Sequence, residues 1–153
     1  MAGGVEAEWI VFVYMSTMKI EREQQWGILM EDKRNWGENW VILGDWNDLS
    51  CREEKNGGLV RSERSFQGFN NIIGQMGMFM LRMEGYKFTW GNNRKDEGFV
   101  EEVLDKAFAS LSWLNNHPHA SVKCVLRSAS DHALLVLEYG KKSGVSEKKI
   151  YIQ

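Results

Sequence analysis

The chain has 153 residues, of which 43% are hydrophobic and 12% aromatic, and its formal net charge is −2. This length fits a single domain, and the apolar content predicts a packed core and excludes a disordered chain. The slight acidic balance lacks the basic excess that is typical of a tight, non-specific DNA binder.

Apolar runs and cysteines bear on where the protein works. The run Trp9–Met15 is far shorter than the roughly 18 residues of a membrane span, and no basic segment of a secretory signal precedes it. Cys51 and Cys124 form neither a disulfide framework nor a metal-ligand spacing. We therefore expect a nuclear or cytoplasmic protein that is not secreted and has no membrane partner.

The first predicted elements form a strand–helix–strand unit. Residues 1–8 have no pattern and are expected to be disordered, whereas Trp9–Met15 is rich in β-branched and aromatic residues and predicts a strand. A broad apolar stripe predicts a helix over Glu21–Trp36, which ends at Gly37, and Trp40–Leu43 predicts a buried strand. We expect the two strands to be neighbours in one sheet, either parallel or antiparallel.

Polar residues follow this second strand directly. Gly44 permits a close turn, and the alternation of a strand places Asp45 and Asn47 on one side and Trp46 on the packed side. Functional groups of open α/β sheets collect just outside the carboxyl ends of strands, so a ligand site is one interpretation. The other is that glycine and aspartate simply end the strand.

Short strands and two more helices make up the rest of the chain. Residues 48–64 are polar and predict a loop, and Ser65–Gly77 follows helical spacing. Further strands are expected at Met78–Met83, Phe88–Trp90, Val100–Asp105, Ala120–Leu126 and Ala133–Leu137, a short helix at Ser110–Asn116, and a Lys-rich tail over residues 140–153 with a short strand at Lys149–Ile152. The predicted domain covers residues 9–139.

Ser130-Asp131-His132 stands immediately before the strand Ala133–Leu137. A carboxylate beside an imidazole makes a compact unit for acid–base chemistry, or for holding a metal and a phosphate. Taken alone, this tripeptide is equally compatible with a loop that carries a surface histidine.

Three motifs in this order carry a resemblance to a known superfamily. Gly44-Asp45-Trp46-Asn47, then Leu104-Asp105, then Ser130-Asp131-His132 resemble the motifs of the endonuclease/exonuclease/phosphatase superfamily. Between them lie further segments that resemble the endonuclease domain of plant LINE-type (non-LTR) retrotransposons: Glu53–Gly58, Phe66–Phe69, Gly85–Arg94 and Leu104–Ser110 with Trp113. The likeness runs from about Val11 to about Leu137.

The resemblance implies an α/β fold that is the C-terminal part of a four-layered sandwich, in which helices flank two β-sheets. The N-terminal strands of the superfamily have no counterpart here. Their absence implies an incomplete domain, with one sheet face uncovered and a metal site that lacks its principal glutamate.

The resemblance also assigns catalytic roles. Asp45 is expected to orient or deprotonate a water molecule, and Asn47 to hold that water or a phosphoryl oxygen. His132 is expected to donate a hydrogen bond to the phosphate, with Asp105 keeping it protonated. Tyr14 matches a tyrosine that reaches the scissile phosphate, although packing alone would also explain an aromatic residue there.

Metal and substrate contacts complete the expected site. Asp131 is expected to hold a divalent ion, Mg²⁺ or Mn²⁺, because such ions prefer oxygen ligands. Arg52, Lys55 and Arg94 are candidates for binding DNA, although each is also a typical solvated loop charge. No small-molecule cofactor is expected, and a missing N-terminal half or a reverse transcriptase domain is an expected partner.

Three functions are compatible with these motifs. The first is a metal-dependent endonuclease derived from a retrotransposon, which hydrolyses DNA phosphodiester bonds. The second is a catalytically dead fragment that acts as a binding module or has no selected function. The third is a phosphatase of the same fold, against which the retroelement-like segments count.

Overall fold

The computed structural model describes residues 7–126, 128–140 and 147–152. The disorder expected for residues 1–8 therefore falls mostly outside the described residues, as does the part of the expected tail over 141–146. None of the described helices is long and apolar enough to cross a membrane.

The predicted strand–helix–strand unit is present at the start of the first sheet. β1 (Trp9–Tyr14) and β2 (Trp40–Asp45) pair in parallel across helix α1 (Lys19–Lys33), so that Tyr14 lies beside Asp45 at the carboxyl ends of both strands. All six residues of β2 are buried, because this strand has neighbours on both edges and layers on both faces.

The other half of the first sheet runs antiparallel to β2. β8 (Asp105–Ala109) pairs with β2 and β4 (Phe79–Met80) pairs with β8, which gives the strand order β1-β2-β8-β4. The antiparallel register places Asp105, the first residue of β8, opposite Asp45, the last residue of β2. Two acidic residues 60 positions apart in the sequence thereby become direct neighbours.

The expected strand Val100–Asp105 is wrong, since the chain changes sheets within it. Glu101–Glu102 forms β7 of a small third sheet, with β3 (Lys55–Asn56) and β6 (Trp90–Gly91) on either side. The Val103 backbone N–H donates to the carbonyl of Glu54, the residue before β3, whereas the Leu104 carbonyl accepts from Trp46, the residue after β2. Asp105 therefore begins a strand instead of ending one.

A second four-stranded sheet has the order β11-β10-β9-β5. Its strands are β5 (Met83–Gly85), β9 (Ser121–Val125), β10 (Leu134–Tyr139) and β11 (Lys148–Ile152). The single strand expected over Met78–Met83 is wrong, because β4 belongs to the first sheet and β5 to the second, with Leu81 buried between them. The short strand expected at Lys149–Ile152 is confirmed as β11, which pairs antiparallel with β10.

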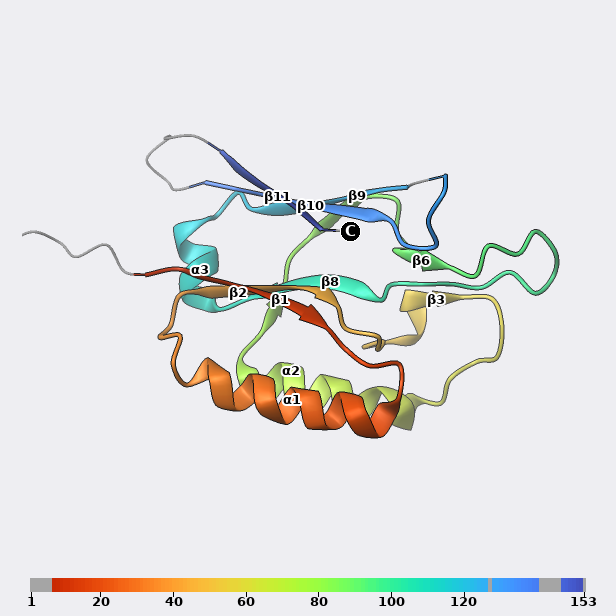
Figure 1. Ribbon diagram of the computed structural model, residues 1–153, viewed down its shortest axis with the longest axis horizontal. Helices are drawn as coiled ribbons and strands as arrows, with labels where there is room; N and C mark the ends of the chain where they lie inside the picture. Colours follow the sequence, from red (N-terminus) through yellow and green to blue (C-terminus); the bar gives the residue numbers. More distant parts are fainter. Residues whose placement is uncertain (1–6, 127, 141–146, 153) are drawn as a thin grey trace, which may run out of the picture.

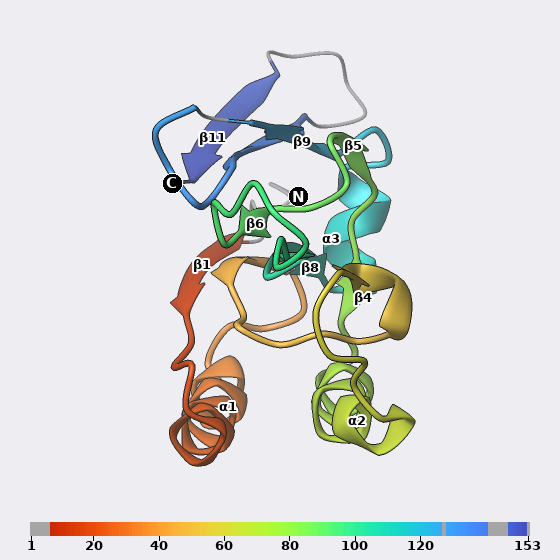
Figure 2. The same cartoon turned by 90° about the vertical axis from the view of Figure 1, so that its right-hand side faces the viewer.

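The two sheets face each other, and α1 and α2 (Gln67–Met76) cover the outer face of the first sheet (Figures 1 and 2). Successive side chains of β2 point to opposite faces of the first sheet. Ile42 therefore packs against the helices, whereas Val41 and Leu43 pack between the two sheets. The expectation of an uncovered sheet face is wrong, because β9 and β10 supply the facing layer. The α/β sandwich is confirmed, with helices over one outer face in the described part of the chain.

Three short helices complete the elements. These are the 3₁₀ turns η1 (Arg52–Glu54) and η2 (Glu63–Phe66) and the helix α3 (Leu111–Asn116). The hydroxyl of Ser110 accepts a hydrogen bond from the Trp113 backbone N–H and so caps the N-terminus of α3. Trp113 itself is fully buried between the ends of the two sheets.

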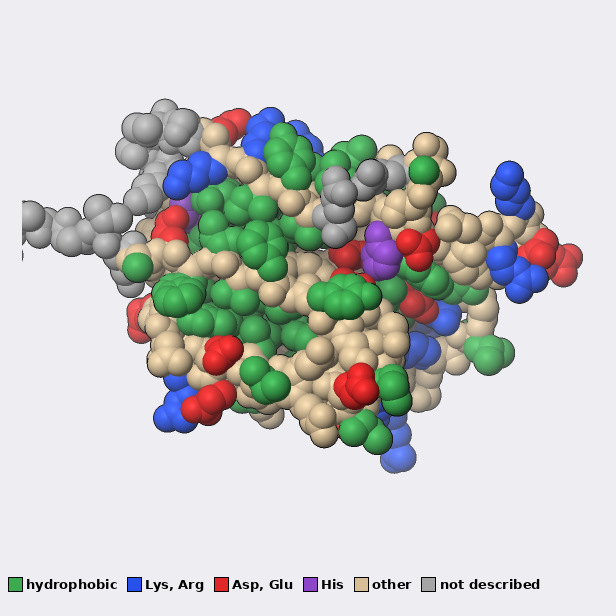
Figure 3. Space-filling model, in the orientation of Figure 1, with side chains coloured by type: hydrophobic (Ala, Val, Ile, Leu, Met, Phe, Trp, Pro, Cys, Tyr) green, Lys and Arg blue, Asp and Glu red, His purple; other side chains and the backbone are tan. Residues whose placement is uncertain are grey.

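In the described part of the chain, β1 of the first sheet and β11 of the second are edge strands on the same side of the sandwich (Figure 2). Trp9, Phe12 and Tyr14 on β1 are exposed, by 43%, 60% and 80%. Hydrophobic side chains gather along this side of the molecule (Figure 3).

Candidate active site

Asp45 occupies the carboxyl end of β2 and is held there by its neighbours. The residue is only 6% exposed, and its Oδ1 accepts from the Asn47 backbone N–H at 2.8 Å. The Asn47 side-chain amide donates to the Met15 carbonyl at 2.7 Å and to Asp45 Oδ2 at 3.2 Å. Asn47 adopts a left-handed backbone (φ 48°), which asparagine tolerates better than most residues. Asp45 at the end of β2 and Asn47 just after it therefore form one rigid unit, which is tied to Met15 directly after β1.

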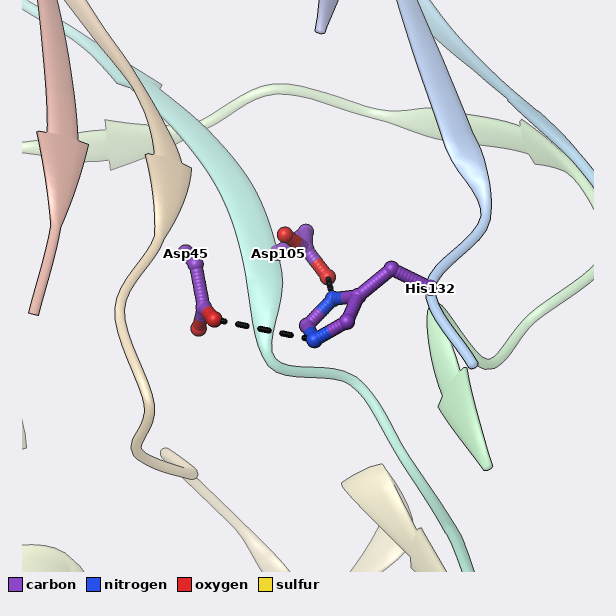
Figure 4. A group of neighbouring side chains, drawn as sticks. All are labelled: Asp45, Asp105 and His132. Atoms are coloured by element: carbon purple, nitrogen blue, oxygen red, sulfur yellow. Dashed lines mark hydrogen bonds and ion pairs between the residues drawn. The ribbon is translucent and has the colours of Figure 1, made fainter. Parts of the chain in front are cut away.

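Asp105 and His132 complete a cluster with Asp45 (Figure 4). His132 Nδ1 lies 2.9 Å from Asp105 Oδ2, and its Nε2 lies 3.8 Å from Asp45 Oδ2. The imidazole thus stands between two carboxylates of the first sheet, although it comes from the loop that leads into β10 of the second. Three motifs that are distant in the sequence converge, as expected.

Thr89, which the sequence did not identify, positions two members of this cluster. Its buried hydroxyl accepts from the backbone N–H groups of Leu104 and Asp105, each at 2.9 Å. Its own carbonyl accepts from the Ala133 N–H at 2.7 Å, next to His132. Only the pairing of three segments creates this role, so no local pattern signals it.

A buried ionic network supports the loop after β2. Lys106 is fully buried, and its Nζ lies 2.7 Å from the Asp48 carbonyl and 3.3 Å from Glu54 Oε2. The Asp48 carboxylate accepts from Arg22 at 3.2 Å and from Arg61 at 3.1 Å. A lysine among the apolar residues of a strand was the available signal for such a network, because a buried charge requires a partner.

The environment shifts the pKa values of the cluster in directions that suit acid–base chemistry. Burial, followed by the charge of Asp105, raises the pKa of Asp45 to about 6. The hydrogen bond to Asp105 raises the pKa of His132 above its usual value, against the opposing effect of burial. Near neutral pH, this arrangement favours an ionised Asp45 beside a protonated His132.

The donor set fits a divalent ion held through carboxylates. One ligand atom each of Asp45, Asp105 and His132 lies within 4.8 Å of the others, and no fourth described residue joins this group. Because its raised pKa favours the imidazolium form, His132 is a poor metal ligand, so carboxylate oxygens would hold the ion.

Asp131 and Tyr14 lie beside the cluster. Asp131 is exposed, and its Oδ2 accepts from Trp90 Nε1 at 3.3 Å. Tyr14 is 80% exposed and neighbours Asp45 across the β1–β2 pair. The metal role expected for Asp131 and the phosphate contact expected for Tyr14 stay predictions.

The three basic residues expected to bind DNA each have an acidic partner. Arg52 pairs with Glu63 at 3.3 Å and Arg94 with Asp96 at 3.0 Å, both on the surface. Lys55 pairs with Glu102 at 3.1 Å and is less exposed. Their role in substrate binding likewise stays a prediction.

Comparison with known proteins identifies the fold. No protein-family model and no curated protein matches the sequence. Among solved structures, the chain is similar to the endonuclease domain of TRAS1, a telomere-specific non-LTR retrotransposon, with a TM-score of 0.61 and 19% sequence identity. The match covers 87% of this chain and 56% of that domain. Over most of its length, this protein therefore has the α/β fold of a retrotransposon endonuclease domain, of which it spans just over half.

Proposed function

We propose that this protein is a metal-dependent phosphodiesterase that hydrolyses DNA phosphodiester bonds, as a retrotransposon-type endonuclease does. The convergence of Asp45 and Asp105 on the His132 imidazole carries this proposal. This arrangement places Asp45, which is suited to accept a proton, beside His132, which is suited to donate a hydrogen bond, at the carboxyl end of β2.

His132 is the proposed phosphate-binding group. Asp105 accepts a hydrogen bond from the Nδ1–H group, which fixes the ring and leaves the Nε2–H to donate to a non-bridging phosphoryl oxygen. Negative charge grows on that oxygen in the transition state, so this hydrogen bond is strongest there.

Asp45 is the proposed base for the attacking water. Its pKa of about 6 leaves it ionised near neutral pH, yet basic enough to accept a proton from water as the new P–O bond forms. Asn47 keeps the Asp45 carboxylate in place through two hydrogen bonds and is the proposed partner of the same water.

The Asp131 carboxylate is the proposed holder of Mg²⁺ or Mn²⁺. A bound divalent ion would supply positive charge that offsets the negative charge of the phosphoryl oxygens. The proposed contacts to the DNA backbone are Tyr14, Arg52, Lys55 and Arg94. The proposed location of the protein, nuclear or cytoplasmic, fits this substrate.

A second candidate is a binding module without catalytic activity. The observation in its favour is that the match covers only 56% of the TRAS1 domain, so part of that domain has no counterpart in the compared chain. A polypeptide equivalent to that part, or a reverse transcriptase domain, is the proposed partner in this case.

Nicking of supercoiled plasmid tests the two candidates against each other. With Mg²⁺ or Mn²⁺, Asp45→Ala is expected to lower the nicking rate by about 10²–10⁴-fold, the usual contribution of a general base. Asp32→Ala, which removes an exposed carboxylate on α1, is the matched control and is expected to nick like wild type. Equal rates for wild type and Asp45→Ala would leave the binding module as the better account.

A further inference from the structure

Asp131 lies on the surface of the protein, yet its surroundings hold its backbone in one place. It stands in the loop that leads into β10 and directly precedes His132. The side chain of an exposed residue ordinarily changes rotamer within nanoseconds. Here the Gly91 N–H donates to the Asp131 carbonyl at 3.0 Å, and Trp90 and His132 form a β-bridge. The backbone that carries the Asp131 carboxylate is therefore fixed on both sides.

The indole of Trp90 fixes the Asp131 side chain as well. Its Nε1 donates to Asp131 Oδ2 at 3.3 Å. An indole N–H is a donor only and a carboxylate is an acceptor only, so the two groups are matched. Oδ1 of Asp131 accepts no hydrogen bond from any residue that the structure describes. The contact with Trp90 thus engages one carboxylate oxygen and leaves the other as a ligand atom.

Trp90 is itself held by the residues behind it. Its ring packs against a buried apolar cluster formed by Leu49, Phe66 and Leu104. Leu49 belongs to the loop after β2, and Leu104 directly precedes β8, so this cluster is part of the carboxyl-end region of the first sheet. The indole therefore links the first sheet to Asp131, which lies on a loop of the second.

A group that hydrogen-bonds to a ligating carboxylate governs how well that carboxylate binds a metal. It orients the ligand before the ion arrives, and its loss typically weakens metal binding by roughly 10–100-fold. Trp90 has this relation to Asp131, which is the carboxylate proposed to hold the divalent ion.

We propose that Trp90 is a positioning residue for divalent-ion binding, because its indole N–H holds the Asp131 carboxylate with one oxygen open to Mg²⁺ or Mn²⁺. The inference rests on the proposed function, from which it takes Asp131 as the ligand. An indole N–H has no lone pair to offer a cation, so Trp90 acts only through Asp131.

Binding of Mn²⁺ to the whole 153-residue chain tests the proposal without DNA and without cleavage. The electron paramagnetic resonance signal of free Mn²⁺ measures the bound fraction. Trp90→Phe keeps an aromatic ring and removes the N–H, so it is expected to weaken Mn²⁺ binding about tenfold. Asp131→Ala is expected to weaken binding at least as much. Adding Trp90→Phe to Asp131→Ala should cause no further loss, because the indole has then lost the carboxylate through which it acts.

Trp113→Phe is the matched control. Trp113 is a buried tryptophan whose Nε1 has no hydrogen-bond partner among the described residues, and it lies on α3, next to the start of β2 and not its carboxyl end. This variant is expected to bind Mn²⁺ like wild type. Thermal unfolding of both phenylalanine variants shows whether they are folded, so that a loss of folded protein is not counted as a loss of affinity.

Three results would overturn the inference: wild-type affinity in Trp90→Phe, equal losses in Trp90→Phe and Trp113→Phe, or additive losses in the double variant. If Asp131→Ala weakens Mn²⁺ binding and Trp90→Phe does not, the proposed ligand stands and the positioning role falls. If Asp131→Ala binds Mn²⁺ like wild type, both fall. Because no cleavage is measured, a protein that fails to nick plasmid still gives a decisive result here.

Discussion

At the scale of single residues, the two carboxylates around His132 differ in what they bind. Asp105 is tied to the imidazole at 2.9 Å and its backbone N–H donates to the Thr89 hydroxyl, whereas Asp45 stands 3.8 Å from the ring. Asp105 therefore fixes the imidazole, and Asp45 remains available for the water molecule of the proposed reaction.

The pH dependence of nicking follows from the two shifted pKa values. The rate should rise as Asp45 ionises around pH 6 and fall where His132, with its raised pKa, loses its proton. In Asp105→Asn, the imidazole loses its charged acceptor, so the alkaline limb should move to lower pH. Nicking rates between pH 5 and 9 check this; an alkaline limb that stays in place would contradict the role of Asp105.

Stability should report the Asp45 pKa independently of activity. Because the folded pKa is raised, the folded state binds more protons than the unfolded state between about pH 4 and pH 6, and wild-type stability falls as pH rises through this window. Asp45→Asn removes this loss. The difference between the Tm of the variant and the Tm of wild type should therefore shift in favour of the variant by about 2–4 °C from pH 4.5 to pH 8. Calorimetry at both pH values measures it; the same difference at both would refute the shifted pKa.

The sequence predicted the cluster but not its supports. Asp45 and Asn47 follow an apolar strand, and His132 precedes one, so local patterns place each of them at a sheet end. Thr89 acts through segments that meet only after folding, so its role has no local signature. Lys106 is recognisable as a charge among apolar residues, but its partners lie in a loop some 50 residues earlier, so the sequence does not identify them.

At the scale of elements, Gly44 determines how closely β1 and β2 approach. Its backbone has φ 141°, and a Cβ atom at this position would lie 2.0 Å from the Val13 carbonyl oxygen. No side chain fits there unless β1 moves, and β1 carries Tyr14 and leads into Met15, which holds the Asn47 amide.

Gly44→Ala should accordingly lower the free energy of unfolding by about 2 kcal/mol or more, since it combines strain with a backbone clash. Gly74→Ala on α2 is the control: a Cβ atom there meets nothing within 4 Å, so the substitution should stabilise by about 0.5–1 kcal/mol. Urea unfolding of both variants checks the pair. Equal effects of the two substitutions would show that the close contact at Gly44 is unimportant.

The length of an element decided whether the sequence could predict it. β1, β2, α1 and β10 have enough residues for their periodicity to be read. β4, β6 and β7 have two residues each, and the chain passes from one sheet to another beside them. A run such as Met78–Met83 therefore looks like one strand, although tertiary pairing divides it between two sheets.

At the scale of the whole molecule, the sandwich has an apolar side where the outer edge of β1 pairs with no other described strand. An exposed, uncharged edge strand is a template for pairing with another chain. The sequence of β1, Trp-Ile-Val-Phe-Val-Tyr, contains no lysine or proline, and the strand has no bulge, that would prevent pairing with another chain.

Phe12→Lys should therefore reduce self-association of the protein at high concentration. Phe12 is 60% exposed, so the cost in stability should stay within about 0.5 kcal/mol. Ile28→Lys adds the same charge at a 64% exposed position on α1, away from the strand edge, and should reduce association less. Light scattering against concentration compares the three proteins, and equal effects of both lysines would point to net charge instead of the edge.

The candidate site spans the two sheets, since Asp45 and Asp105 belong to the first and His132 leads into the second. If one sheet slipped by a single residue, about 3.4 Å along a strand, the 2.9 Å hydrogen bond between His132 and Asp105 would break. The Nδ1 proton of this histidine thus reports how the two sheets are aligned. Its NMR resonance should be lost through exchange with solvent whenever the sheets shift, even while the strands within each sheet stay paired.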